Sequence, residues 1–417
     1  MVVPADWKEV KVADVIVDSF SGPSPTCLER NIQGEEWGVF KTTCSTMEQG
    51  WDYTKHKVLP RAFWGMTRSL IEVGDTVITK AGPRHRVGVA SYVNRTLDRL
   101  IVSGKMIGLR PNKTVVCPPF LALALSSKPT QEFLNQRTTG MAESQVNFEN
   151  VALLETPLYL PPLKEQEAIA EALSDADAAI ESLDALIAKK RDVKQATMQQ
   201  LLTGRTRLPG FTADWKEVRL GDLGRCLRGV SYKGDSDLSD GDSPTTVRLL
   251  RSNNVQNSLI QFNDVQYVNH GCVSDEQILR RNDIVICMAN GSKVLVGKTG
   301  LYKDSQDTRY TFGAFMGCFR SSSDQAHAIF VRYLFLTKQY QDYISNLLAG
   351  SSINNLTPKS IESLLFNVPL LKEQEVIAEA LSVMDDELEA LTEQVSKLRM
   401  VKEGMMQDLL TGKVRLV

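Results

Sequence analysis

The 417-residue sequence lacks several features that would place it in a specialised class of proteins. It has no apolar run long enough to cross a bilayer. Its beginning, MVVPADWKEV, has no basic segment followed by an apolar core, which is the pattern of a secretory signal. Its seven cysteines are odd in number and have no Cys-x-x-Cys spacing, so they indicate neither a disulfide framework nor a zinc site. We therefore expect reduced thiols and a cytosolic protein.

The sequence motifs of catalysis are also missing. The four histidines are scattered, without metal-ligand spacing or a partner nucleophile. The segment Gly291–Thr299 is similar to a phosphate-binding loop, but five residues separate its glycines where the motif has four, so we predict a hairpin turn. Cys117–Phe120 (CPPF) is similar to the Asn/Asp-Pro-Pro-aromatic motif of amino-methyltransferases, but a cysteine accepts the required hydrogen bond poorly. We expect no catalysis and no metal site in this chain.

Charge is small in total and unevenly distributed. The net charge is −2. Residues 1–155 carry 18 basic and 16 acidic side chains, and residues 218–363 carry 16 and 14. The segments 156–217 and 364–417 are acidic instead, with 8 basic against 10 acidic and 6 against 10. This balance argues against binding to any polyanion through bulk charge, but it allows local nucleic-acid-binding patches.

What the sequence does contain is an internal duplication with an offset of 208 residues. Leu163–Gly204 returns as Leu371–Gly412 with more than half of the positions identical, and Asp6–Val10 (DWKEV) returns as Asp214–Val218. Between these anchors the offset drifts to 209 and 210. A fixed offset indicates a duplicated unit, and small drifts are expected where loops change while the elements stay in register.

The repeated stretch predicts two long helices. Apolar residues step by four and three along Ile169–Ile187 and Ile377–Leu398, which is a heptad seam. Gly204 and Gly412 stand where a left-handed cap would close each helix. Each helix is acidic early and basic late, so antiparallel pairing brings opposite charges together. We predict an antiparallel two-helix coiled coil that holds two globular regions apart. The alternative is that each helix only covers its own domain.

The regions between the repeats predict a mixture of strands and helices. Runs rich in β-branched residues and bounded by Gly, Pro and Asn predict short strands at Asp75–Lys80, Val87–Val93 and Asp283–Cys287. Helices are expected near the end of each region, at Phe120–Arg137 and Ala328–Leu348. We predict an α+β protein with two domains of mixed, mostly antiparallel sheet, a coiled coil between them and an internal pseudo-twofold repeat. The expected boundaries are 1–155, 156–208, 209–363 and 364–417.

Clustered polar and basic loops are the candidate nucleic-acid contacts, because Arg pairs with guanine and Asn with adenine. In the first region these residues are Lys55, Lys57, Lys80, Arg84, His85 and Arg86. In the second they are Arg248, Arg251, Asn253, Asn254, Asn290, Ser292, Lys293, Ser352, Asn354 and Asn355. Taken singly, each is better explained as part of a solvated turn, since Asn, Gly and Ser are ordinary turn residues.

The chain closely resembles the specificity subunits of type I restriction–modification enzymes. The resemblance rests on Pro161–Ala170 (PPLKEQEAIA) with its copy from Pro369, the Leu-Leu-Thr-Gly endings, Leu208–Phe211 (LPGF), and Asp214-Trp215. It spans essentially the full length, with two copies in the expected order. One departure, Leu370 in place of Pro162, carries no functional consequence.

This resemblance implies a non-catalytic DNA sequence-specificity subunit. Two target-recognition domains would each read half of a split double-stranded DNA sequence, and the helices would fix the spacer and dock the methyltransferase (modification) subunits, two of which are expected. Those partners would carry S-adenosylmethionine and methylate adenine, while restriction/translocase subunits would use ATP and Mg²⁺. No cofactor is expected in this chain, no membrane partner is implied, and the implied location is the prokaryotic cytoplasm.

Two other functions remain as alternatives. A stand-alone DNA methyltransferase would bind S-adenosylmethionine itself, and the lack of a glycine-rich cofactor loop after a strand argues against it. A coiled-coil scaffold without any nucleic-acid role would carry the same helical repeats.

Overall fold

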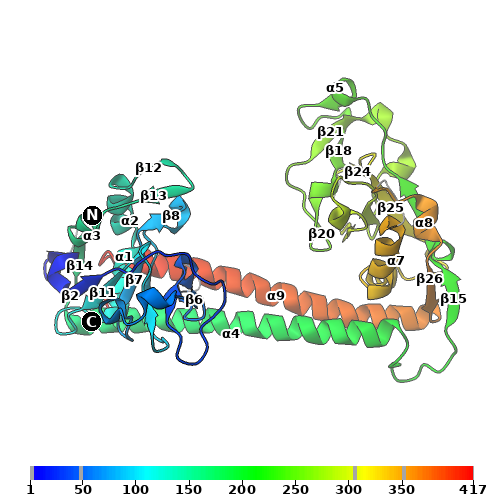
Figure 1. Ribbon diagram of the computed structural model, residues 1–417. Helices are drawn as coiled ribbons and strands as arrows, with labels where there is room; N and C mark the ends of the chain where they lie inside the picture. The colour runs from blue at the N-terminus through cyan, green and yellow to red at the C-terminus, as the bar shows by residue number, and fades with distance from the viewer. Residues whose placement is uncertain (1–3, 47–49, 304–307, 350–353, 417) are drawn as a thin grey trace. The chain divides into compact units, whose positions relative to one another are not determined.

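A computed structural model describes residues 4–46, 50–303, 308–349 and 354–416. The chain forms two compact units (Figure 1). Unit 1 comprises Met1–Ala185 and Glu393–Val417, and unit 2 comprises Leu186–Thr392. Each unit therefore contains one globular domain together with a part of each repeated helix. No helix in the described ranges is long and apolar enough to cross a membrane.

The two repeated helices are α4, Leu163–Leu202, and α9, Leu371–Leu409. Gly204 and Gly412 follow them with φ angles of 68° and 71°, in the left-handed region predicted for the helix caps. Every predicted seam position on both helices is buried or half-buried. The heptad positions thus lie on the face of each helix that packs against other parts of its unit.

In unit 1 the first part of α4 and the last part of α9 run antiparallel. Asp177 pairs with Lys402 at 2.5 Å, and Asp184 pairs with Arg399 at 2.9 Å. The partner's number falls as the number on α4 rises, which is the antiparallel order. The acidic early part of α4 therefore lies beside the basic late part of α9, as the charge pattern predicts.

Unit 2 contains the reciprocal pairing. Lys190 pairs with Glu387 at 2.6 Å, and Lys194 pairs with Asp385. Here the basic late part of α4 lies along the acidic early part of α9. Asp177 with Lys402 and Asp385 with Lys194 stand at the same places in the two repeats, so the duplication preserves the ion pairs as well as the seam.

Unit 1 carries a domain of short strands and helices before α4. Its elements are β1 Lys8–Lys11, β2 Ile16–Phe20, β3 Gly38–Phe40, β4 Ser45–Thr46, β5 Gly50–Trp51, β6 His56–Val58, β7 Thr76–Thr79, β8 Ala81–Gly82, β9 Ala90–Tyr92, β10 Leu100–Ile101, β11 Met106–Pro111, α1 Pro118–Ser126, α2 Lys128–Gln136, β12 Thr139–Ala142, β13 Gln145–Asn147, α3 Asn150–Leu154 and β14 Pro157–Leu160. The central sheet has the order β2-β11-β7-β9 and is antiparallel throughout.

The domain of unit 2 repeats this plan with larger sheets. Its elements are β15 Lys216–Arg219, β16 Gly224–Arg228, α5 Gly234–Asp237, β17 Leu238–Ser239, β18 Thr246–Leu250, β19 Val255–Gln256, β20 Leu259–Ile260, β21 Gln266–Asn269, β22 Ile284–Cys287, β23 Thr299–Leu301, β24 Tyr310–Phe312, β25 Met316–Ser321, α6 Ala328–Leu334, α7 Lys338–Ala349, α8 Pro358–Glu362 and β26 Leu365–Val368. The main sheet has the order β16-β25-β22-β23-β20-β19. Among the strands described in both units, most pairs are antiparallel, and β10·β3, β18·β24 and β20·β23 are parallel.

The two predicted single helices near the ends of the domains are each divided. Helix α1 ends at Ser126 and α2 starts at Lys128, because Pro129 cannot continue a helix but is tolerated in the first turn of a new one. Helix α6 ends at Leu334 and α7 starts at Lys338. The Thr337 hydroxyl accepts a hydrogen bond from the Tyr340 N–H, which caps the start of α7.

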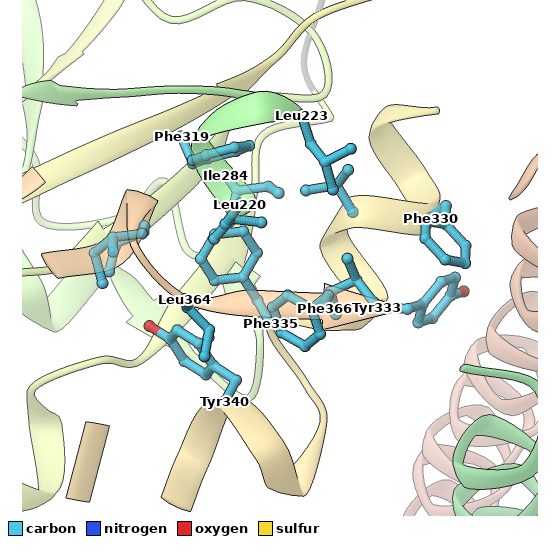
Figure 2. Close-up of a cluster of buried hydrophobic side chains, with 14 of the residues drawn as sticks. Leu220, Leu223, Ile284, Phe319, Phe330, Tyr333, Phe335, Tyr340, Leu364 and Phe366 are labelled. Atoms are coloured by element: carbon cyan, nitrogen blue, oxygen red, sulfur yellow. The ribbon is translucent and has the colours of Figure 1, made fainter. Parts of the chain in front are cut away.

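A hydrophobic core in unit 2 joins the main sheet, α6, α7 and the helix pair (Figure 2). Phe319 of β25 packs against Phe335 with ring centroids 5.4 Å apart, and Phe335 packs against Tyr340 of α7 at 5.0 Å. The same cluster includes Leu381 of α9, which is completely buried. An equivalent core in unit 1 joins α1 to both long helices. In each unit the domain is thus fixed to the helices by continuous apolar packing.

The repeated Lys-Glu-Gln-Glu sequence explains how each domain is held at a helix start. The amide of Gln166 is 1% exposed, accepts from the Cys117 N–H at 2.9 Å and donates to the Pro161 carbonyl at 2.9 Å. Gln374 makes the same two bonds, accepting from His327 and donating to Pro369, each at 3.0 Å. Glutamine occurs at this position in both repeats because its amide can both donate to and accept from buried backbone groups that would otherwise lack a partner.

Candidate nucleic-acid interface

A cleft of about 920 Å³ lies in unit 2 beside the ends of β22 and β25. Its wall combines charged, amide and aromatic side chains, among them Arg228, Tyr232, Arg251, Gln266, Asn290, Phe315, Asn354 and Asn355. Four of the residues predicted from sequence therefore meet here: Arg251, Asn290, Asn354 and Asn355. Arginine and amide groups with an aromatic surface are the chemistry by which proteins bind nucleobases and phosphates.

Backbone and side-chain hydrogen bonds hold the asparagines on the cleft wall. The Asn290 amide donates to the Ser252 hydroxyl at 3.2 Å, and the Asn354 amide donates to the Gly291 carbonyl at 3.2 Å. The Asn290 N–H also donates to the Asn354 carbonyl at 3.4 Å. These bonds join three segments that are distant in the sequence, and they restrict the orientations of both amides before any ligand arrives.

Arg251 and Asn253 converge on one exposed carboxylate. The Arg251 guanidinium donates to the Asp264 carboxylate at 3.1 Å and to the Asp264 carbonyl at 3.0 Å, and the Asn253 amide donates to the same carboxylate at 2.8 Å. The Asp264 side chain is 75% exposed. An exposed ion pair of this kind is weak, so a phosphate or base could replace the carboxylate as the acceptor.

Asn254 has a structural role instead. It is 1% exposed, and its amide donates to the Gln261 and Asn263 carbonyls at 3.0 and 2.8 Å. Its side-chain oxygen accepts from the Arg251 N–H at 2.9 Å. These bonds stabilise the 3₁₀ turn at Ser252–Asn254 and enclose the side chain, so the prediction that Asn254 contacts a base does not fit the structure.

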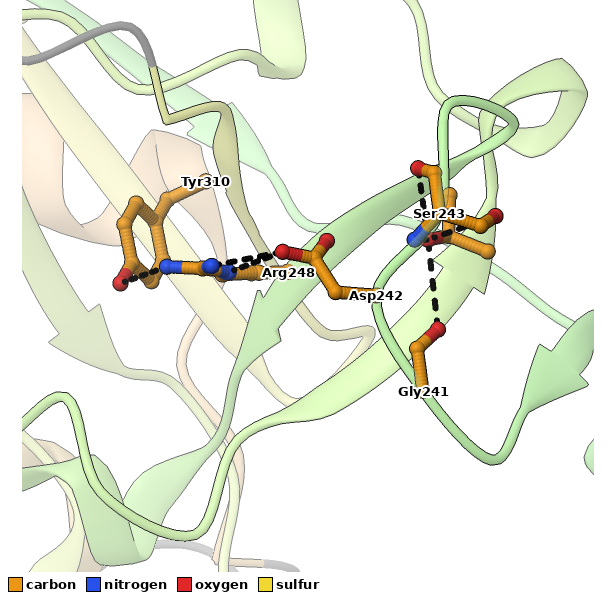
Figure 3. A network of polar contacts seen from close by, with 6 residues as sticks. Gly241, Asp242, Ser243, Arg248 and Tyr310 are labelled. Atoms are coloured by element: carbon orange, nitrogen blue, oxygen red, sulfur yellow. Dashed lines mark hydrogen bonds and ion pairs between the residues drawn. The ribbon is translucent and has the colours of Figure 1, made fainter.

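Arg248 lies in a separate polar network (Figure 3). It donates to the Asp242 carboxylate at 2.6 Å and to the Tyr310 hydroxyl at 3.1 Å, and its guanidinium lies 5.6 Å from the Tyr310 ring centroid. The hydrogen bonds to Tyr310 and Asp242 raise the pKa of Arg248 above its usual value. Asp242 precedes a turn in which Ser243 donates its N–H to the Thr246 hydroxyl at 2.9 Å. Arg248 remains a candidate contact outside the cleft.

The segment Gly291–Thr299 leads into β23, which pairs antiparallel with β22, so it is part of a hairpin as predicted; the connection is longer than a tight turn and contains a 3₁₀ turn. Ser292 is exposed, and its N–H donates to the Asn290 side chain at 2.9 Å. Lys293 opens a 3₁₀ turn at Lys293–Leu295 and donates to the Leu348 carbonyl at 3.4 Å. Both residues therefore lie on a tip next to the cleft. The remaining candidate, Ser352, lies outside the described residues.

In unit 1 the equivalent tip is the 3₁₀ turn Arg84–Arg86. Arg84 pairs with Glu143 at 2.9 Å, Arg86 donates to the Thr42 carbonyl at 3.2 Å, and His85 is exposed. Lys80, at the other end of this connection, donates to the Asn150 side chain at 3.3 Å. Lys80, Arg84 and Arg86 are basic side chains on or beside this tip, and Glu143 pairs with one of them, so the tip remains a candidate contact for phosphates.

Lys55 and Lys57 form a second group in unit 1. Lys57 lies in β6 and pairs with Glu29 at 3.3 Å, while Lys55 precedes β6 and lies 3.8 Å from Asp52. Strand β6 belongs to the sheet β10-β3-β6, whereas Lys80 and the tip adjoin β7 of the central sheet. The structure therefore places the unit 1 candidates in two groups on different sheets.

Sequence reasoning missed Phe315, Arg228, Gln266 and Tyr232. Arg228 lies in β16 and Gln266 in β21, two strands far apart in the sequence, so no local pattern indicates that both line one cleft. Phe315 had a usable signal: it immediately precedes β25, as Lys105 precedes the equivalent strand β11. A repeat comparison at the offset of 210 would have shown an aromatic residue replacing a basic one.

Comparison with known proteins gives one consistent result. The sequence profile described as "Type I restriction modification DNA specificity domain" matches residues 4–189 and again residues 212–397. The Type I restriction enzyme MjaVIII specificity subunit of Methanocaldococcus jannaschii is 25% identical over 99% of this chain and 94% of its own length. The Type I restriction enzyme EcoEI specificity subunit of Escherichia coli is 30% identical over 42% of this chain and 29% of its own length.

Solved structures agree at the level of the fold. The S subunit of a type I restriction–modification system from M. genitalium has a TM-score of 0.59 and 15% identity, covering 98% of this chain and 96% of that one. A chain from a study of assembly and conformational transition in a type I restriction–modification system has a TM-score of 0.58 and 17% identity, covering 99% and 100%.

Proposed function

Because the chain belongs to the family of type I restriction–modification DNA specificity subunits, we propose that each of its two recognition domains reads one half of a split double-stranded DNA sequence. Members of this family are non-catalytic subunits, and they act on DNA in a complex with other restriction–modification subunits. The proposal assigns one half-site to the domain of unit 1 and the other to the domain of unit 2.

The observation that carries the proposal is a repeated scaffold with different exposed tips. In unit 1 the buried Asp75 pairs with Arg110 at 3.0 Å, and in unit 2 the buried Asp283 pairs with Arg320 at 2.6 Å. Each carboxylate is 2% exposed. The framework is thus kept while the exposed chemistry changes, which is what two readers of different sequences require.

The exposed tips are both 3₁₀ turns, but they differ in charge. The turn between β7 and β9 has the sequence Arg-His-Arg, whereas the turn between β22 and β23 has Lys-Val-Leu. We assign phosphate and guanine contacts to the basic tip of unit 1, with Lys80 beside it. We assign base contacts in unit 2 to the cleft asparagines and Arg251, because paired Asn and Arg donors read base edges in the major groove.

We further propose that the helices set the distance between the half-sites. A helix of 40 residues such as α4 is about 60 Å long at 1.5 Å per residue. One turn of DNA is about 34 Å. A helix of this length is therefore long enough to set two readers on successive turns of one duplex.

The outward faces of the helices are our proposed docking surface for the modification subunits. Leu186, Val193 and Val383 are exposed in unit 2, as are Met400 and Val401 in unit 1. The two units offer two such faces, so we propose two modification subunits that carry S-adenosylmethionine, with ATP and Mg²⁺ on restriction subunits. Among the described residues no group of three or more His, Cys, Asp or Glu could hold a metal ion.

Exchange of one recognition domain tests the proposal. Residues 219–363 would be replaced by the same region of another specificity subunit, the complex assembled with its modification subunits, and the methylated sequences mapped. We expect one half of the recognised sequence to change while the other half and the spacer stay the same. A reciprocal exchange of residues 11–155 is the matched control and should change only the other half.

Two outcomes would contradict this assignment: a change in both half-sites, or in neither, from an exchange that leaves assembly intact. Binding of S-adenosylmethionine by the purified chain alone would favour a stand-alone methyltransferase instead. Absence of any DNA shift by the assembled complex would favour a coiled-coil scaffold.

A further inference from the structure

One backbone position is held in the same way in the two units but carries opposite chemistry. In unit 2 the Phe315 carbonyl accepts from the N–H groups of Met288 and Ala289, at 2.9 and 3.0 Å. In unit 1 the Lys105 carbonyl accepts from Lys80 and Ala81, at 2.9 and 3.2 Å. Both residues immediately precede an inner strand, β25 or β11, that is second in the order of its sheet. Phe315 and Lys105 therefore occupy one place in the duplicated scaffold.

The turn that carries Phe315 is firmly held. The Gly313 N–H donates to the Leu250 carbonyl at 3.0 Å, the Met316 N–H donates to the Gly313 carbonyl at 2.8 Å, and the Gly229 N–H donates to the Met316 carbonyl at 3.1 Å. With the two bonds to the Phe315 carbonyl, these fix the backbone on both sides. The side chain is thus presented by a rigid turn.

The Phe315 side chain is 71% exposed although it lies on the wall of the cleft. A single exposed apolar residue is ordinary on a protein surface. This one differs because side chains with donor groups, including Arg251, Asn290 and Asn354, line the same cleft. A fixed apolar ring beside amides that can bind base edges is placed to contact an apolar group on a neighbouring base.

Thymine is the base that presents an apolar group in the major groove, its 5-methyl, and the adenine paired with it presents the N6 donor and N7 acceptor that an asparagine can bind. We infer that Phe315 contacts a thymine 5-methyl in the half-site read by unit 2, beside an adenine read by the cleft asparagines. This inference rests on the proposed function. Lys105, at the same place in unit 1, ends in an ammonium group that donates hydrogen bonds, so it presents a charged donor where unit 2 presents an apolar ring.

Replacement of thymine by deoxyuridine tests this contact, because it removes the methyl group and leaves base pairing unchanged. The probe is a duplex that carries the sequence methylated by this chain with its modification subunits, with each thymine replaced in turn. We expect one position in the unit 2 half-site at which the wild-type complex binds the deoxyuridine duplex about fourfold more weakly than the thymine duplex. This is the change in affinity expected when the contact loses one buried group of about the size of a CH₂. The Phe315→Ala complex should show no difference between thymine and deoxyuridine there.

Two matched variants complete the design. Phe315→Leu keeps an apolar side chain and should retain part of the methyl dependence. Lys105→Ala changes the equivalent position in unit 1 and should leave the methyl dependence in the unit 2 half-site unchanged. Assembly of each variant with the modification subunits is measured by its mass in solution.

The inference is overturned if the wild-type complex binds its split sequence but no thymine shows a dependence on its methyl group. It is equally overturned if Phe315→Ala leaves that dependence unchanged. It is also overturned if Phe315→Ala prevents assembly, since Phe315 would then be a protein contact. Loss of split-sequence recognition by the wild-type complex would instead contradict the proposed function itself, so the two failures are distinguishable.

Discussion

Lengthening both long helices by whole heptads should lengthen the DNA spacer by a calculable amount. A copy of Ile180–Leu186 inserted after Leu186, and a copy of Asp386–Thr392 inserted after Thr392, would extend α4 and α9 by seven residues each. The insertion points correspond, because Asp177 pairs with Lys402 and Lys194 with Asp385. Seven residues preserve the heptad seam, so the apolar faces remain opposed.

The expected change follows from the two helical rises. Seven residues add about 10.5 Å at 1.5 Å per residue, and DNA rises about 3.4 Å per base pair, so the preferred spacer should grow by about 3 base pairs. Because DNA makes a turn in roughly 10 base pairs, that change also turns the second half-site by about 100°. Binding should therefore weaken. Three heptads add about 31.5 Å, or roughly 9 base pairs, which nearly restores the phase.

The assay is binding of the assembled complex to duplexes that keep both half-sites and vary the spacer. We expect optima shifted by about 3 and about 9 base pairs, with the three-heptad variant binding more tightly than the one-heptad variant. A matched control inserts the same residues in α4 only and should disturb the helix pair. An unchanged optimum in variants that assemble normally would remove the idea that the helices measure the spacer.

Two further predictions concern the stability of unit 2. Replacing Arg320 by Met leaves the buried Asp283 carboxylate without its ion-pair partner, while the Arg280 N–H still donates to it at 2.7 Å. The free energy of unfolding in urea should therefore fall by about 3–5 kcal/mol, and adding Asp283→Leu should recover most of it. Equal stability of the single and double variants would refute this. Burial opposes ionisation of Asp385, but hydrogen bonds from Lys194 and Tyr333 and the charge of Arg332 outweigh it and lower its pKa. The ionised Asp385 thus stabilises the fold at pH values above its unfolded-state pKa near 3.8, and this contribution is lost as the pH falls through the folded-state pKa. The Asp385→Asn variant should therefore be less stable than the wild type at pH 7, and the difference should be smaller at about pH 3. A deficit that grows on acidification would contradict the reasoning.

The sequence predicted the long helices well because their signal is local and repeated. A heptad seam, a glycine cap and a charge gradient all lie within one stretch, and each maps onto the structure without a shift. The division at Ser127 was also within reach, since Pro129 interrupts the predicted helix. The division before α7 was not, because it depends on the hydroxyl of Thr337 and on no backbone-breaking residue.

The candidate interface was less accessible from sequence. Asn254 and Arg251 occur in one polar run, and nothing in that run shows that the asparagine amide turns inward to the Gln261 and Asn263 carbonyls. The cleft is assembled from segments between Arg228 and Pro358, so its members meet only through tertiary packing. The buried pairing of Asp283 with Arg320 is likewise invisible until the strands are in register.

The most direct test of the central claim is the methylation pattern produced in cells by this chain with its modification subunits. The proposal predicts one split sequence, with a methylated adenine in each half and a spacer of fixed length between them. Methylation of a continuous sequence, methylation independent of this chain, or methylation by the purified chain alone would contradict the account.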